Sequence, residues 1–163
     1  MKKASAYLIL LNLLFVLAYF LWTIRSKEDL LKDGKQVFLE LAPVDPRSLM
    51  QGDYMRLDYG IAQDQDLDLE TIPTRGFCVV RLDGKGIARK VRMQKGREPL
   101  GADEYLIPYI KGRSNVQLGA NSFFFQEGKA AVYDSAKYGA LRVDRKGNTL
   151  LTGLYDQDLK ELR

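Results

Sequence analysis

The chain has 163 residues, with 25 Lys and Arg against 21 Asp and Glu, no histidine, and a single cysteine, Cys78. This length suits one domain with its own core, and the small, scattered positive charge lacks the basic stripe of a nucleic-acid-binding protein. Without histidine, the commonest general base and the commonest transition-metal ligand are both missing. Cys78 lies in an apolar run and is expected to be buried and inert. The composition therefore favours a protein with no nucleic-acid partner, no metal site and no cofactor.

The N-terminus carries a long uncharged stretch. Residues 4–24 contain no charged side chain, two lysines precede them, and Arg25 follows. About 20 apolar residues are enough to cross the hydrocarbon core of a bilayer, and aromatic residues near both ends of the stretch suit the membrane interfaces. The stretch is longer than the apolar part of a cleavable signal peptide, and no small-x-small cleavage site follows it. We therefore predict an uncleaved transmembrane anchor over residues 1–25.

The orientation of this anchor follows from two arguments. Basic residues flank the stretch almost equally on both sides, so the positive-inside rule alone decides little. Long domains translocate largely regardless of their charge. We therefore predict that the N-terminus lies inside and that the domain lies on the outer, extracytoplasmic side.

Residues 26–35 are typical of a short polar helical stalk, with Ser26 as its N-cap and Gly34 as the residue that ends it. Beyond the stalk, alternating apolar positions and turn residues predict several short strands and two hairpins. These segments are residues 36–44, 53–62, 77–93, 104–110 and 140–156. An alanine-containing stretch over residues 126–139 predicts one helix, closed by Gly139 as its C-cap. The predicted fold is α+β and β-dominated: an N-terminal transmembrane helix, then one mainly antiparallel β domain over residues 36–163 with a short helix near the C-terminus.

The turn at Gly52 and Asp53 leads into one of these strands. The period of two places Asp53 on the apolar face of its strand, and it places Arg89 on the apolar face of the later strand 87–93. A buried carboxylate needs a partner, so one prediction is an ion pair between Asp53 and Arg89. The alternative is that Arg89 lies near a sheet edge, with its stem on the surface and its guanidinium in water.

A resemblance to a family rests on this same turn. The fixed positions of the pattern G-D-Y-x-x-L-x-Y are all matched, by Gly52, Asp53, Tyr54, Leu57 and Tyr59. This pattern is the signature of the bacterial GDYXXLXY family of membrane-anchored proteins, which the chain resembles. Residues 123–143 are similar to the second shared stretch of that family, in which Glu127 and Gly128 precede a helix and a strand. The resemblance implies an inner-membrane location, no settled activity, and a polytopic membrane protein as a partner, and we expect the five motif residues to be structural.

A second resemblance keeps catalysis open as an alternative. The order of anchor, proline and serine, Gly-Asp pair and "ARKV" strand resembles the membrane signal peptidases, whose Ser/Lys dyad needs no histidine because a desolvated lysine can act as the base. Here Val44 stands in the nucleophile's place and Arg89 in that of the lysine. Ser48 follows Pro46, and Lys90 is one residue out of register and expected to face the other way. The sequence therefore predicts no catalytic residue, with Ser48 and Lys90 as the pair that a peptidase would have to use.

Three consecutive phenylalanines, Phe123, Phe124 and Phe125, cannot all be buried on one face of a strand. At least one of them, expected to be Phe124, faces a second layer, the helix or a partner protein. Together with Glu127 and Gly128 they form the predicted interface. The leading hypothesis is thus a membrane-anchored binding or accessory domain.

A small-ligand or peptide sensor is the third class of function. Its binding pocket would be lined by Tyr54, Tyr59 and the phenylalanines.

Overall fold

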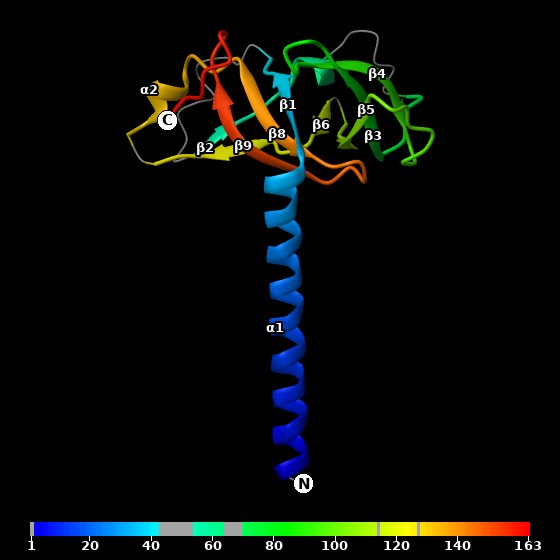
Figure 1. The fold of residues 1–163 in the computed structure, drawn as a ribbon, viewed down its shortest axis with the longest axis vertical. Helices are drawn as coiled ribbons and strands as arrows, with labels where there is room; N and C mark the ends of the chain where they lie inside the picture. Colours follow the sequence, from blue (N-terminus) through cyan, green and yellow to red (C-terminus); the bar gives the residue numbers. More distant parts are fainter. Residues whose placement is uncertain (1, 43–53, 64–69, 114, 127) are drawn as a thin grey trace.

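A computed structural model of the chain describes residues 2–42, 54–63, 70–113, 115–126 and 128–163. One long helix carries a domain of antiparallel strands at its C-terminal end (Figure 1). The helix, α1 (Lys2–Asp33), runs without interruption through the predicted anchor and the predicted stalk. It is long and apolar enough to cross a membrane, which weakly supports a single-pass anchor.

The residues predicted as a helical stalk, 26–35, are helical as far as Asp33, but they form the last turns of α1 and not a separate helix with Ser26 as its N-cap. Good helix formers and no breaker follow Ile24, so α1 continues through them. The predicted end is correct to one residue: α1 stops at Asp33, and the amide of Gly34 donates to the carbonyl of Leu30 at 3.0 Å.

In the part of the chain that the structure describes, the strands form three sheets, and every pair within these sheets is antiparallel. The first sheet has the order β1 (Lys35–Glu40), β8 (Tyr138–Val143), β9 (Thr149–Tyr155). The second pairs β2 (Tyr54–Arg56) with β7 (Ser122–Phe124). The third has the order β4 (Ala88–Gln94), β3 (Arg75–Leu82), β5 (Glu104–Lys111), β6 (Val116–Leu118). A 3-10 turn, η2 (Gly60–Gln63), and a short helix, α2 (Ala130–Tyr133), complete the fold, so the predicted β-dominated α+β class is confirmed.

The predicted short helix near the C-terminus is confirmed as α2, but its predicted end is wrong. Only Ala130–Tyr133 is helical, and Gly139 is not a C-cap but a residue of β8. There Gly139 pairs with Leu39 on one side and Leu154 on the other, and a Cβ at this glycine would lie 3.3 Å from the ring of Tyr59. The central position of β8 between two strands therefore outweighs the local helix preference of the alanines.

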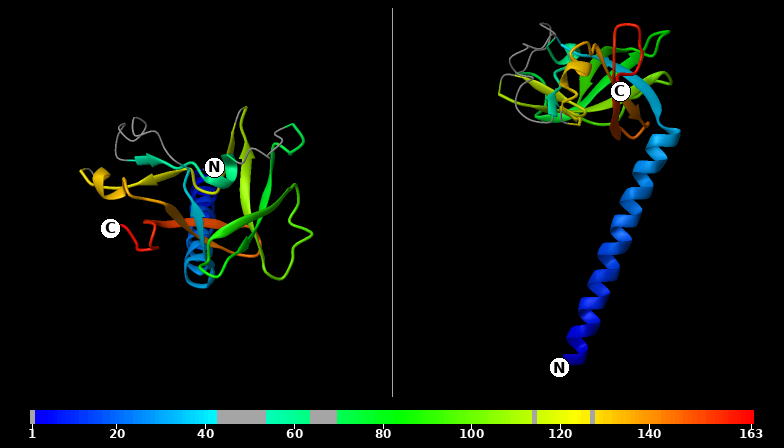
Figure 2. Two further views of the ribbon diagram at one scale, coloured as in Figure 1. Left: turned by 90° about the horizontal axis from the view of Figure 1, so that it is seen from above. Right: turned by 90° about the vertical axis from the view of Figure 1, so that its left-hand side faces the viewer.

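The core lies between the first and third sheets, which face each other across the domain (Figure 2). Buried side chains from all three sheets meet there, and they include Val37, Leu39, Leu57, Tyr59, Cys78, Val80, Ile107, Tyr109, Leu141 and Leu154. Three sheets thus share one apolar interior.

On the face of the third sheet that points away from the core, the buried carboxylate of Glu104 connects β5 to β4. Both oxygens of Glu104 accept hydrogen bonds from the guanidinium of Arg92, at 3.0 and 2.9 Å, and one also accepts from the amide of Gly101. The Arg92 hydrogen bonds, followed by that from Gly101, lower the pKa of Glu104 to about 2. The same guanidinium donates to the carbonyl of Pro99 and so holds the loop between the two strands.

Candidate functional site

The second half of the family motif is part of the core. Leu57 and Tyr59 are buried, and the Tyr59 hydroxyl donates to the carbonyl of Ala120 at 2.7 Å. The amide of Leu57 donates to the carbonyl of Asn121 at 2.9 Å, and Tyr59 forms a single antiparallel bridge with Leu41. Burial raises the pKa of Tyr59 above its usual value, so its hydroxyl stays a donor. These contacts attach the motif segment to the approach of β7 and to the end of β1.

The first half of the motif is only partly described. Tyr54 opens β2, where its backbone lies opposite Phe124. Gly52 and Asp53 lie outside the described residues. Of the ion pair predicted between Asp53 and Arg89, the structure therefore describes only Arg89.

Arg89 does not face the core as its spacing predicted. The register between β3 and β4 shifts between Val79 and Val80, so that Val80 opposes Lys90 and Arg81 opposes Arg89. The Arg89 side chain is 66% exposed, and its guanidinium lies 3.8 Å from the carboxylate of Asp83. A β-bulge of this kind inserts one residue and reverses the faces of those beyond it.

The same bulge corrects the prediction for Lys90, which was expected to face the other way. Directly opposed residues of an antiparallel pair share a face, so Lys90 lies on the side of buried Val80. It lines a hollow of about 410 Å³ with Glu40, Gly60 and Ile61. Ser48, its proposed partner in a dyad, lies outside the described residues, as does Val44.

The environment of the single thiol, Cys78, makes it unreactive. Cys78 is fully buried in β3. Burial raises the pKa of Cys78 to about 12, although the positive charge of Lys90 opposes the shift. A thiol that stays protonated at neutral pH is a poor nucleophile and a poor metal ligand.

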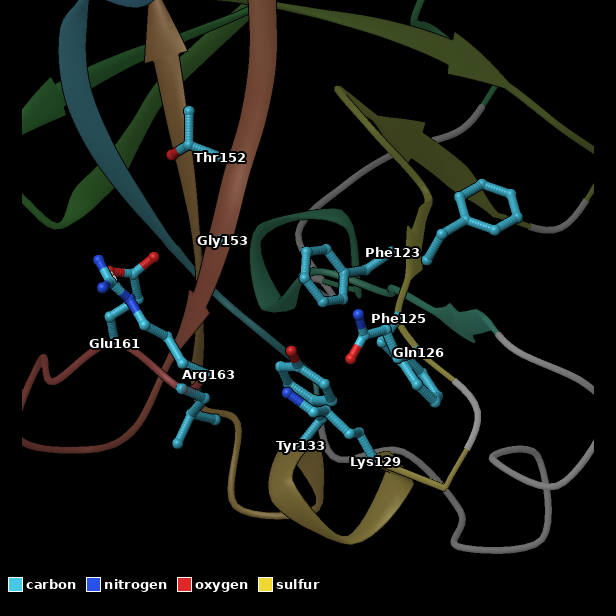
Figure 3. A pocket seen from close by; sticks show the side chains of 11 residues that line it. Phe123, Phe125, Gln126, Lys129, Tyr133, Thr152, Gly153, Glu161 and Arg163 are labelled. Carbon is cyan, nitrogen blue, oxygen red and sulfur yellow. Dashed lines mark hydrogen bonds and ion pairs between the residues drawn. The ribbon is translucent and has the colours of Figure 1, made fainter.

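A second hollow gathers the three phenylalanines, and we call it the aromatic hollow (Figure 3). Its volume is about 510 Å³, and its lining residues are Phe123, Phe124, Phe125, Gln126, Lys129, Tyr133, Thr152, Gly153, Glu161, Leu162 and Arg163. The ring centroids of Phe123 and Phe125 each lie 5.2 Å from the ring centroid of Tyr133, which belongs to α2. Phe124 does not share this packing and is 72% exposed.

The rim of the aromatic hollow is charged. Arg163 donates to Glu161 at 2.7 Å, and Lys129 lies at the base of α2. Of the remaining predicted interface residues, Gly128 adopts a φ of +82° just before α2, and Glu127 lies outside the described residues.

The ligand pocket predicted for a sensor does not form with its full set of residues. Tyr59 is buried in the core and does not line the aromatic hollow.

Sequence reasoning missed the contributions of β9 and of residues 161–163 to the aromatic hollow. They lie far from the phenylalanines along the chain, and no local sequence pattern links the two segments.

In the part of the chain that the structure describes, no group of His, Cys, Asp or Glu side chains could hold a metal ion. The arrangement offers an apolar floor, an exposed phenyl ring and a mixed-charge rim, which suit the capture of a protein segment.

The comparisons agree with the motif. The family model described as GDYXXLXY protein matches residues 16–154, from within α1 to the last residues of β9. No curated protein and no solved structure matches the chain. The family match covers most of the sequence, and the chain therefore belongs to the GDYXXLXY protein family.

Proposed function

We propose that this protein is a single-pass, membrane-anchored accessory domain that binds a polytopic integral membrane protein and performs no catalysis. In this proposal the domain lies on the extracytoplasmic side of a bacterial cytoplasmic membrane. The observation that carries the proposal is the 72% exposure of Phe124 beside the aromatic hollow. Interface hot spots are commonly large aromatic side chains that lie next to apolar pockets.

The anchor strengthens this reasoning. A domain tethered by one helix shares a two-dimensional surface with its partner, so a weak contact gains from a high effective concentration. The aromatic hollow is lined by residues of β7, α2, β9 and the C-terminus. Of these elements, α2 lies on one flank of the domain, to the side of the axis of α1 (Figure 1). A partner in the same bilayer can approach that flank from the side.

The test is recovery of the partner with full-length protein in mild detergent. Phe124→Ala is expected to reduce recovery of a stoichiometric polytopic protein at least tenfold, since loss of an aromatic hot spot costs about 2 kcal/mol or more. Ile110→Ala is the matched control, because Ile110 is 48% exposed but lies on β5, away from the hollow. Equal recovery with both variants, or a protein that is always alone, would overturn the proposal.

A Ser/Lys peptidase is the second candidate, and the bulge that turns Lys90 toward the core face is the observation that favours it. A Ser/Lys dyad uses a lysine as its base and therefore needs no histidine. Under the accessory proposal, Ser48→Ala and Lys90→Ala leave the processing of other membrane polypeptides unchanged. Loss of a cleavage event in both variants, with unchanged thermal stability, would establish the peptidase instead.

A further inference from the structure

A third hollow, which we call the junction hollow, lies where α1 meets the domain. It has a volume of about 460 Å³ and is lined by one face of α1 and by the turn between β8 and β9. The side chains that matter here are Trp22, Arg25, Asp29 and Asp33 from the helix and Lys146 and Asn148 from the turn. Their spacing of three, four and four residues along α1 places the helical members on one face.

The junction hollow has a defined depth in the membrane. The uncharged stretch of α1 ends at Ile24, so Trp22 lies at the boundary of the hydrocarbon core. From Trp22 to Asp33 the helix rises by roughly 16 Å, and a headgroup layer is about 5–8 Å thick on each side. The lower part of the hollow therefore lies among lipid headgroups, and its upper part is lined by the β8–β9 turn, which lies beside the C-terminal end of α1 (Figure 1).

The helix holds the domain firmly at this depth. Leu30 is buried against the domain, and the guanidinium of Arg142 in β8 donates to the carbonyl of Gly34 at 2.9 Å. The turn therefore keeps its position over the same face of α1.

The charges in the junction hollow are of both signs. Arg25 and Lys146 supply two cations, and Asp29 and Asp33 supply two carboxylates. Within the described residues, none of these four side chains makes an ion pair with another. Asp144 differs, because its carboxylate accepts from the amides of Lys146 and Asn148 at 2.8 Å each and so shapes the turn.

We propose that the junction hollow binds the headgroup of a zwitterionic phospholipid that carries a primary ammonium, such as phosphatidylethanolamine. Arg25 and Lys146 hold the phosphate through charge-assisted hydrogen bonds. Asp29 and Asp33 accept hydrogen bonds from the ammonium, and Trp22 packs beside the start of the acyl chains. This site rests on the membrane anchor of the proposed function, but it does not depend on the partner at the aromatic hollow.

The experiment is native mass spectrometry of the full-length protein released from nanodiscs that contain equal amounts of phosphatidylethanolamine, phosphatidylcholine and phosphatidylglycerol. Wild-type protein is expected to retain phosphatidylethanolamine at least threefold above the other two lipids. The double variant Arg25→Gln/Lys146→Gln loses retained lipid. The double variant Asp29→Asn/Asp33→Asn loses the preference for phosphatidylethanolamine over phosphatidylcholine, because the methylated ammonium of phosphatidylcholine cannot donate a hydrogen bond.

Lys27→Gln and Glu28→Gln are the matched controls, because they change charge at the same level of α1 but do not line the hollow. Trp22, the single tryptophan of the chain, reports by its fluorescence whether each variant keeps the junction intact. Retention in proportion to abundance, a preference for phosphatidylglycerol, or equal losses in the control variants would overturn the lipid site. Failure of the anchor itself would appear differently, as protein that leaves the membrane when washed at alkaline pH.

Discussion

At the residue scale, two buried tyrosines differ in one contact. The hydroxyl of Tyr59 donates to the carbonyl of Ala120, whereas the buried hydroxyl of Tyr109 has no hydrogen-bond partner among the residues that the structure describes. A buried hydroxyl that donates a hydrogen bond stabilises the fold. A buried hydroxyl without a partner destabilises the fold by the free energy of its desolvation. The two positions therefore provide an internal comparison.

Tyr59→Phe is expected to lower the free energy of unfolding by about 1 kcal/mol, since it leaves the Ala120 carbonyl without its donor. Tyr109→Phe is expected to be neutral or stabilising, because it removes a hydroxyl that is buried without a partner. Thermal unfolding of full-length protein in detergent micelles measures both, at roughly 2–4 °C per kcal/mol for a chain of this size. Equal losses in the two variants would contradict this account of the motif tyrosine.

The faces of individual residues could be predicted only where the strands are regular. The period of two that places Asp53 on the apolar face of its strand places Leu57 and Tyr59 on the same face, and both of these are buried. The same rule failed for Arg89 and Lys90, because the bulge opposite Val79 and Val80 adds one residue to β4. A bulge depends on pairing with the neighbouring strand, so the sequence of β4 alone carries no sign of it.

At the element scale, the junction between α1 and β1 leaves no room at Gly34. A Cβ there would collide with the carbonyl oxygen of Leu30 and lie 3.2 Å from the Cβ of Arg142. Gly34→Ala is expected to lower the stability of the domain by about 1–3 kcal/mol, as overpacking does. Gly84→Ala is the matched control, because nothing lies within 4 Å of a Cβ at that turn position. Thermal unfolding that gives the same midpoint for both variants would contradict the tight junction.

The Arg92–Glu104 contact predicts a dependence on pH. The pKa of Glu104 is about 2 in the folded chain, against about 4.3 for an unperturbed glutamate. Since the folded pKa is the lower one, the contact stabilises the fold fully above about pH 4.3 and loses this effect as the pH falls toward 2. Arg92→Gln is therefore expected to lower the unfolding midpoint at pH 7 and to approach wild type in acid. A difference that stays constant from pH 7 to pH 3 would contradict this role.

Local chemistry decided which elements could be predicted. Both hairpins could be predicted because glycine-containing turns separate their strands. In the structure an aspartate shapes each turn: Asp83 accepts from the amides of Lys85 and Ile87, and Asp144 acts likewise in the second turn. The short helix expected within residues 126–139 forms over Ala130–Tyr133, but it does not reach Gly139, because β8 is needed between β1 and β9. Helix propensity is a weak preference that tertiary pairing overrides.

At the scale of the whole molecule, an anchor helix and a β-dominated domain could be predicted from composition and periodicity. The assembly of the strands into three sheets could not, because β1 pairs with β8 across about a hundred residues of chain. Separation along the chain is also the reason that neither the aromatic hollow nor the junction hollow could be predicted. The aromatic hollow joins β7 and α2 to residues 161–163, and the junction hollow joins α1 to the β8–β9 turn.

The central claim is that the domain acts by holding a membrane protein at the aromatic hollow. The most direct measurement places a photo-crosslinking amino acid at position 124 of the full-length protein in its own membrane, with the same substitution at position 110 as the control. The account predicts an adduct between position 124 and a polytopic membrane protein, identified by mass spectrometry, and none from position 110. Adducts of position 124 with lipid or with a second copy of the chain alone, or equal adducts from both positions, would contradict it.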